Sequence, residues 1–114
     1  MKYIVAVFKP SRLDAVIDAA SAAGANGLTV SEVRGYGRQR GKTEVYRGAE
    51  YTVRLVPKVK IEVACTDAIV DRVVEAISEA AKTDRIGDGK VFVMPLDTAF
   101  RIRTGESGEA AILG

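Results

Sequence analysis

The chain of 114 residues contains no histidine, no tryptophan and a single cysteine, Cys65. Without histidine it lacks the commonest general base and the commonest transition-metal ligand, and it cannot form the Ser–His or Cys–His pairs of many hydrolases. One cysteine excludes a disulfide within the chain and, with no histidine, excludes a structural zinc site. This cysteine usage is typical of a reducing compartment, so we expect a cytoplasmic protein.

Long apolar runs are also missing. The N-terminal stretch MKYIVAVFKP is too short for a signal peptide or a membrane span, so we expect no direct membrane insertion. Aromatic residues make up only 6% of the chain against 47% hydrophobic residues, which predicts an aliphatic core. The length suits a single domain over residues 1–114. The net charge of +2 is too small to indicate a nucleic-acid partner by itself.

The spacing of apolar residues predicts four strands and two helices. Strands are expected at 3–8, 28–33, 59–65 and 91–94, where β-branched residues cluster or alternate with polar ones. One helix is expected after Ser11 as its N-cap and before Gly24, with a turn at Asn26-Gly27. The second is expected from about Asp67. Its buried face comprises Val70, Val73, Val74, Ile77 and Ala81.

The resulting order, β-α-β-β-α-β, predicts an α+β fold of the ferredoxin-like type. Right-handed crossovers place both helices on one face of a four-stranded antiparallel sheet. The other face would stay bare, although the first strand supplies apolar residues to it. Because the chain has no spare segment to cover that face, we expect a second copy of the chain to do so in an obligate homo-oligomer.

Residues 34–60 form a long polar segment, which we interpret as an irregular functional loop. Between Arg34 and Lys42 it carries four positive charges and no negative one, which indicates a local anion site. Gly41-Lys42-Thr43 does not complete a P-loop, because the glycine required five positions earlier is Tyr36.

The run Arg34-Gly35-Tyr36-Gly37 matches the first half of RNP1, a box found in RNA-binding domains of the same β-α-β-β-α-β order. The second half should bring stacking aromatics, and this chain has none there. Because the first half of the box and the element order do match, an RNA-binding ferredoxin-like module is the alternative function.

Two further patterns indicate a phosphate ligand. Gly87-Asp88-Gly89-Lys90 is suited to a backbone nest whose N–H groups accept a phosphate, although the same residues also suit an ordinary tight turn. Arg101 and Arg103 are two apart in a segment, 100–103, that we expect to be extended. Their side chains would then point the same way and form a fork that binds phosphate oxygens.

Five blocks in order, GYGRQRG, YRGAEY, PKVKIEV, IGDGKVFV and RIRTGE, make the chain similar to the PII nitrogen-regulatory signal-transduction proteins of the GlnB/GlnK type over essentially its whole length. The resemblance implies a homotrimer of ferredoxin-like subunits with ATP or ADP bound in three clefts between subunits. It implies nucleotide binding by twelve residues: Thr29, Gly37, Arg38, Gln39, Ala64, Gly87, Asp88, Gly89, Lys90, Arg101, Ile102 and Arg103.

The resemblance also implies a second effector, 2-oxoglutarate, bound by Gln39, Gly41 and Lys58, with Gln39 ligating a Mg²⁺ shared with the ATP phosphates. Because Mg²⁺ takes most of its oxygen ligands from phosphates and small molecules, it needs no acidic cage. ATP and 2-oxoglutarate should then bind synergistically, whereas ADP should not support the acid.

Residues 37 to about 55 correspond to the T-loop of the family, which docks on target proteins. Tyr51 would accept a uridylyl or adenylyl group. Implied partners are an ammonium channel that recruits the protein to the membrane, a nucleotidyltransferase, the adenylyltransferase of glutamine synthetase and a sensor kinase. The chain departs from relatives at Lys42, Ala49 and Arg54, which bear on the choice of partner. We expect no enzymatic activity, although a slow ATPase is a third hypothesis.

Overall fold

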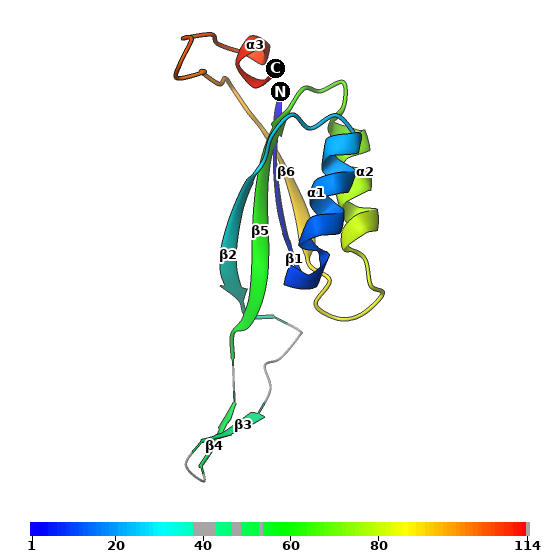
Figure 1. The fold of residues 1–114 in the computed structure, drawn as a ribbon, viewed down its shortest axis with the longest axis vertical. Coiled ribbons are helices and arrows are strands. Elements are labelled where there is room, and N and C mark those ends of the chain that lie inside the picture. The colour runs from blue at the N-terminus through cyan, green and yellow to red at the C-terminus, as the bar shows by residue number, and fades with distance from the viewer. Residues whose placement is uncertain (38–42, 47–48, 53, 114) are drawn as a thin grey trace.

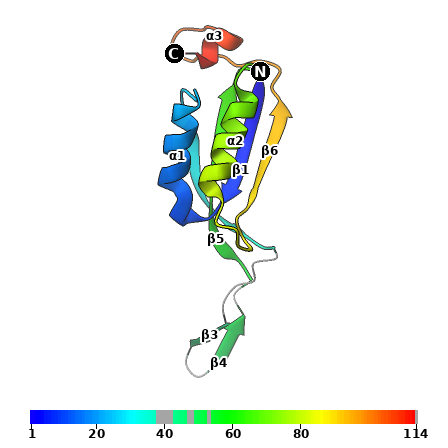
Figure 2. The same cartoon turned by 90° about the vertical axis from the view of Figure 1, so that its right-hand side faces the viewer.

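A four-stranded antiparallel sheet forms the centre of the molecule in the computed structural model, which describes residues 1–37, 43–46, 49–52 and 54–113. Its order is β2 (Thr29–Gly35), β5 (Val56–Cys65), β1 (Lys2–Phe8) and β6 (Lys90–Pro95). The helices α1 (Leu13–Ala22) and α2 (Val70–Ala81) lie side by side on one face (Figures 1 and 2). The predicted α+β ferredoxin-like fold is confirmed.

The core lies between the sheet and the two helices. The central strand β1 buries Ile4, Ala6 and Phe8, whereas its alternate residues are only partly buried. The neighbouring β5 follows the same rule with Val59, Ile61, Val63 and Cys65. Since successive strand residues point to opposite faces, one face of each strand supplies the core and the other stays open.

The face of α2 that we predicted is confirmed. Val70, Val73, Ile77 and Ala81 are buried at helical spacing, and Val74 packs against them partly exposed. The helix begins at Val70, three residues after Asp67. The free thiol of Cys65 is buried, and burial raises its pKa. It is a small core residue.

The end of α1 is as predicted, but its start is not. Gly24 adopts φ 111° after the last helical turn. The N–H groups of Gly24 and Ala25 donate to the carbonyls of Ser21 and Ala20, both at 3.0 Å, which is a Schellman motif. At the start, Ser11 does not cap the helix: Pro10 opens the 3₁₀ turn η1 (Pro10–Arg12) and α1 begins only at Leu13. Proline has its φ already fixed for such a first turn.

Three other local predictions are wrong. Asn26-Gly27 forms no turn but lies in an irregular connection to β2. Within the segment interpreted as irregular, β3 (Thr43–Tyr46) and β4 (Ala49–Thr52) pair as an antiparallel hairpin. Residues 102–104 form a turn rather than an extended piece, because Phe100 bridges to Ser107 and closes a short loop before the helix α3 (Glu109–Ile112).

The β3–β4 hairpin projects past the ends of β2 and β5 along the long axis of the molecule (Figure 1). The extents are 58 × 29 × 22 Å and the radius of gyration is 17.0 Å, against about 13 Å for a compact chain of this length. The sheet and helices therefore make a compact body, and the hairpin is an arm that extends from it. No helix among the described residues reaches the length and apolar character that crossing a bilayer requires.

Candidate functional site

The turn Gly87–Lys90 lies at the end of the sheet from which the hairpin arm departs. The register pairs Val7 with Lys90, Val33 with Lys58 and Gly35 with Val56. Each of these pairs lies at the same end of its strands. The ammonium of Lys58 donates a hydrogen bond of 2.5 Å to the carbonyl oxygen of Gly87. The fold thus brings Lys58 and the Gly87–Lys90 turn together near the base of the arm.

Both glycines of this turn have backbone conformations that favour glycine. The φ angles are 94° for Gly87 and 102° for Gly89. A Cβ on Gly89 would lie 1.8 Å from the carbonyl oxygen of Val7, so this turn packs directly on the end of β1. Successive backbone N–H groups in such turns form concave sites for anions. The residues present therefore fit a phosphate group.

Positive charge gathers around the turn. Lys9, just after β1, pairs with the Asp88 carboxylate at 3.3 Å, Lys58 of β5 donates to the Gly87 carbonyl, and Lys90 is the first residue of β6. Burial and the nearby charge of Lys9 both lower the pKa of Lys58, and the Asp88 carboxylate partly offsets them. Hydrogen bonds from Thr83, and then the contact with Lys9, hold the pKa of Asp88 below its ordinary range. The net charge favours an anionic ligand.

Two open hollows border this end of the sheet. One, of about 590 Å³, lies where β2 ends and β5 begins, next to the arm. It is lined by Pro10, Glu32, Val33, Arg34, Pro57, Lys58 and Val59. The other, of about 350 Å³, lies between α2, β1 and β6, and Asp88, Gly89 and Lys90 form part of its wall. Both volumes fall in the range of small-ligand sites. Lys58 and the glycine turn each border one of them.

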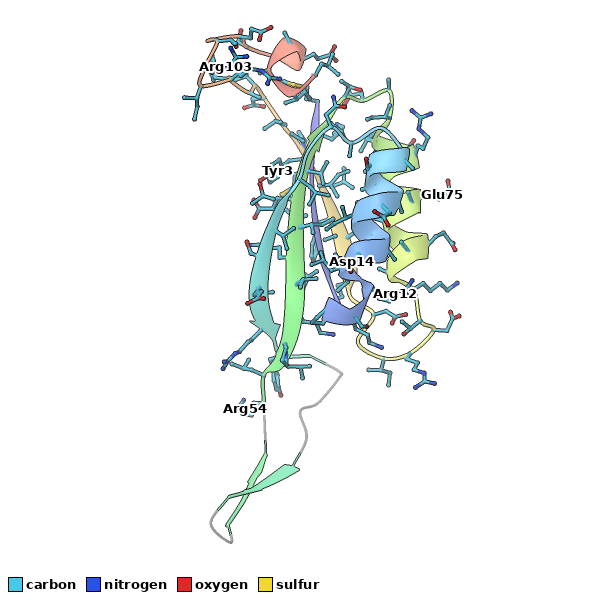
Figure 3. All side chains as sticks on the ribbon, viewed as in Figure 1. Tyr3, Arg12, Asp14, Arg54, Glu75 and Arg103 are labelled. Atoms are coloured by element: carbon cyan, nitrogen blue, oxygen red, sulfur yellow. The ribbon has the colours of Figure 1, made fainter. Side chains whose placement is uncertain are left out.

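Other nucleotide residues lie away from this end of the sheet. Ala64 pairs with Tyr3, at the far end of β1 from Val7 and Lys90, whereas Thr29 pairs with Glu62, which lies opposite Val5 in the middle of β1. Tyr3 and Val7 are four residues apart, which is about 13 Å along a strand. Figure 3 shows Arg103 at this far end, away from Arg54 near the base of the arm. One chain therefore divides the predicted nucleotide residues into two separate groups.

Arg101 and Arg103 do not form the fork that we predicted, because they belong to a turn. The guanidinium of Arg101 is held within the C-terminal segment, donating to the carbonyl of Leu113 at 2.9 Å and lying 3.6 Å from the Glu106 carboxylate. Arg103 and Ile102 are exposed, the latter completely. The two arginines thus differ: one is tied to its own chain and the other is free to meet a ligand or a second copy.

Several predicted residues lie outside the part of the chain that the structure describes. They are Arg38, Gln39, Gly41 and Lys42. Tyr51 lies in β4, where its backbone pairs with Glu44, and its side chain is not described. Among the described residues, no group of three His, Cys, Asp or Glu side chains gathers to hold a metal ion. The roles assigned to Gln39, Gly41 and Tyr51 therefore stay predictions.

Two groups of contacts were not found from the sequence, one at the glycine turn and one on the open face of the sheet. Lys9 and Thr83 both meet the Asp88 carboxylate, yet neither belongs to a recognisable motif. On the open face of the sheet, the Tyr3 hydroxyl donates to Glu62 at 2.5 Å, and Lys60 lies 3.3 Å from the same carboxylate. The only sequence signal for the second group was the alternation that places Lys60 and Glu62 on one face of β5.

Known proteins resemble this chain over nearly its whole length. The family described as nitrogen regulatory protein P-II matches residues 1–106. The nitrogen regulatory protein P-II of Cereibacter sphaeroides is 57% identical over 112 residues, which is 98% of this chain and 100% of that protein. The P-II protein of Rhizobium etli is 56% identical and the nitrogen regulatory protein GlnK of Escherichia coli is 53% identical, with the same coverage. The chain belongs to the P-II family of nitrogen regulatory proteins.

Proposed function

We propose that this protein senses ATP, ADP and 2-oxoglutarate and regulates target proteins through the T-loop segment, residues 37 to about 55. The observation that carries the proposal is the Gly87–Lys90 turn, whose two left-handed glycines lie beside Lys58 and Lys90. Backbone N–H groups and ammonium groups together suit a di- or triphosphate. Membership of a regulatory family supports a binding protein rather than an enzyme.

The nucleotide would bind between copies of the chain in a homotrimer. Ala64 and Arg103 lie toward the opposite end of the sheet from the glycine turn, and Thr29 lies level with the middle of β1. A second copy that brings its own far end to this turn would complete one site from two half-sites. The open face of β6 supports such an assembly, since Phe92 and Met94 are 49% and 40% exposed. Copies would then cover that face.

The organic acid would bind at Lys58, beside the phosphate groups. The ammonium of Lys58 lies at the Gly87 carbonyl, so a carboxylate held by Lys58 would sit next to the glycine turn. Gln39 would hold a Mg²⁺, which would supply positive charge to the phosphates and the acid. ADP lacks the third phosphate and would not support this arrangement.

The arm that begins at this site would carry the signal. The chain leaves β2 at Gly35 and returns at Val56, so a ligand at the base of the arm acts where the arm is attached. Partners would be an ammonium channel at the membrane, a nucleotidyltransferase, glutamine synthetase adenylyltransferase or a sensor kinase. Uridylylation or adenylylation of Tyr51 would add bulk and charge to the docking arm. The protein would work in the cytoplasm.

Calorimetric titration tests this function. We expect ATP and ADP to bind the wild-type protein, and 2-oxoglutarate to bind only when Mg-ATP is present. Lys90→Ala should weaken ATP binding about tenfold, because one charged contact to phosphate is lost. Arg85→Ala is the matched control, since Arg85 is exposed in the same loop and lines neither hollow.

Absence of any nucleotide binding would overturn the proposal. Equal binding of 2-oxoglutarate with and without Mg-ATP would remove the shared-metal arrangement. A single-stranded RNA serves as the probe for the alternative function. An RNA-binding module would bind it with an affinity that falls steeply with salt concentration, and would ignore both metabolites.

A further inference from the structure

The carboxylate of Asp88 is the centre of a closed hydrogen-bond network. One oxygen, Oδ2, accepts the backbone N–H groups of Thr83 at 2.8 Å and Asp84 at 2.9 Å. The other, Oδ1, accepts the Thr83 hydroxyl and lies 3.3 Å from the Lys9 ammonium. Lys9 also donates to the Thr83 hydroxyl oxygen at 3.0 Å. Both oxygens are thus bound by groups of the protein.

These bonds determine the shape of the loop between α2 and β6. No backbone-to-backbone hydrogen bond ties residues 83–89 to another described residue outside the sheet. Asp84 also stands at φ 61°, a conformation that costs a non-glycine residue about 1 kcal/mol. A loop with one strained residue and few backbone bonds keeps a single conformation only when side chains hold it. Asp88 and its partners supply that restraint.

The network connects the loop to the end of β1. Lys9 follows the last residue of β1, and the Lys9 and Asp88 side chains are only 18% and 25% exposed. Gly89, the next residue after Asp88, packs on the carbonyl of Val7. The Gly87–Lys90 turn is therefore fixed from both sides to the rigid sheet.

We propose that Lys9 and Thr83 are positioning residues for the phosphates of the bound nucleotide, acting through Asp88. This inference rests on the proposed nucleotide site and assigns different roles to the residues within it. The Asp88 carboxylate holds the loop and does not contact the ligand, whereas the N–H groups of the turn face the phosphates. A site made of backbone donors depends on such support, because a shift of about 0.5 Å already loses its geometry.

The test compares variants that alter the network without touching the ligand. Thr83→Val keeps the shape of the side chain, carries no charge change and removes the hydroxyl. Lys9→Met removes the ammonium. We expect each to weaken ATP and ADP binding about tenfold in calorimetry. Thr83→Ser restores the hydroxyl and should restore the affinity to within about twofold of wild type. Arg85→Met removes a positive charge from the same loop at an exposed position that lines neither hollow, so it should bind as wild type does.

Amide NMR spectra give the readout that a purely stabilising role would not change. In the absence of nucleotide, the Gly87 and Gly89 signals should move in Thr83→Val and return in Thr83→Ser, while signals of the sheet stay in place. Should Thr83→Val fold poorly, Thr83→Ala and Lys9→Met carry the same comparison.

The outcomes separate the two proposals. If the wild type binds nucleotide and Thr83→Val and Lys9→Met bind it equally well, the positioning role is wrong and the nucleotide site stands. Lower thermal stability in these variants with unchanged affinity would likewise overturn the positioning role alone. If the wild type binds no nucleotide, the proposed function is wrong and the positioning role with it.

Discussion

Single residues in this chain are constrained by their surroundings to very different degrees. Gly89 and Gly105 both have positive φ angles, 102° and 75°. A Cβ on Gly89 would collide with the Val7 carbonyl, whereas a Cβ on Gly105 would meet nothing within 4 Å. Gly89 is therefore required by close packing as well as by its backbone angle. The sequence shows two glycines, and only the fold distinguishes them.

Tyr3 and Glu62 form a pair whose effect on stability depends on pH. The hydrogen bond between them raises the pKa of Tyr3 above its ordinary 10.0. The same bond, followed by Lys60, lowers the pKa of Glu62 below its ordinary 4.5. The stabilisation is therefore present between these two values. It is lost as the pH rises through the Tyr3 pKa and as the pH falls through the Glu62 pKa.

Replacing Tyr3 with phenylalanine should remove this contribution. We expect Tyr3→Phe to unfold at a lower urea concentration than wild type at pH 7, with a difference that shrinks toward pH 3 and toward pH 11. Urea unfolding across this pH range provides the measurement. Tyr36→Phe is the control, because Tyr36 is 68% exposed, whereas the Tyr3 hydroxyl is bonded to Glu62. A Tyr3→Phe difference that stays constant with pH would contradict the assignment.

Among the elements, α1 and α2 are joined by two arginines in a reciprocal arrangement. Arg12, just before α1, donates from Nε to the Ala80 carbonyl in the last turn of α2 at 2.8 Å. Arg72, in the first turn of α2, donates from Nε to the Ala23 carbonyl at the end of α1 at 3.1 Å. Each arginine thus satisfies a C-terminal carbonyl of the other helix and places its positive charge at the negative end of that helix's dipole.

Removal of either arginine should loosen the helix pair. We expect Arg12→Met and Arg72→Met each to lower the free energy of unfolding by about 1–2 kcal/mol, which is typical of a hydrogen bond from a charged group. Arg85→Met, at an exposed position in the loop after α2, should change it by less than about 0.5 kcal/mol. Urea denaturation monitored by circular dichroism gives the comparison. Losses no larger than that of the control would show that the carbonyls find other partners.

At the scale of the whole molecule, the open face of the sheet is the surface through which the proposed trimer would assemble. Phe92 pairs with Val5 and Met94 pairs with Tyr3 across β1, so these four side chains share the face away from the helices. The Tyr3–Glu62–Lys60 group lies on the same face. An apolar half and a charged half therefore adjoin, and an assembly that buries the first must accommodate the second.

A charge on the apolar half should prevent assembly. We expect Phe92→Glu to raise the dissociation constant of the trimer at least a hundredfold, since burying an unpaired carboxylate costs several kcal/mol. Nucleotide affinity should fall with it, because the site would lose its second copy. Ala22→Glu, on an exposed position of α1, is the control and should stay trimeric. Sedimentation velocity at micromolar concentrations distinguishes the masses. A Phe92→Glu protein with the wild-type mass would place the interface elsewhere.

Local patterns in the sequence determined the element order, the buried stripe of α2, the glycine that ends α1 and the resemblance to the P-II family. They sufficed because periodic burial and left-handed glycines leave their mark within a few neighbouring residues. Other features were decided only by the tertiary structure. Lys9 meets Thr83 and Asp88 across more than seventy positions, Phe100 bridges to Ser107 in a segment that was expected to be extended, and the predicted nucleotide residues are spread along one sheet. These contacts depend on register and chain crossing, which bring distant residues together without any periodicity in the sequence between them.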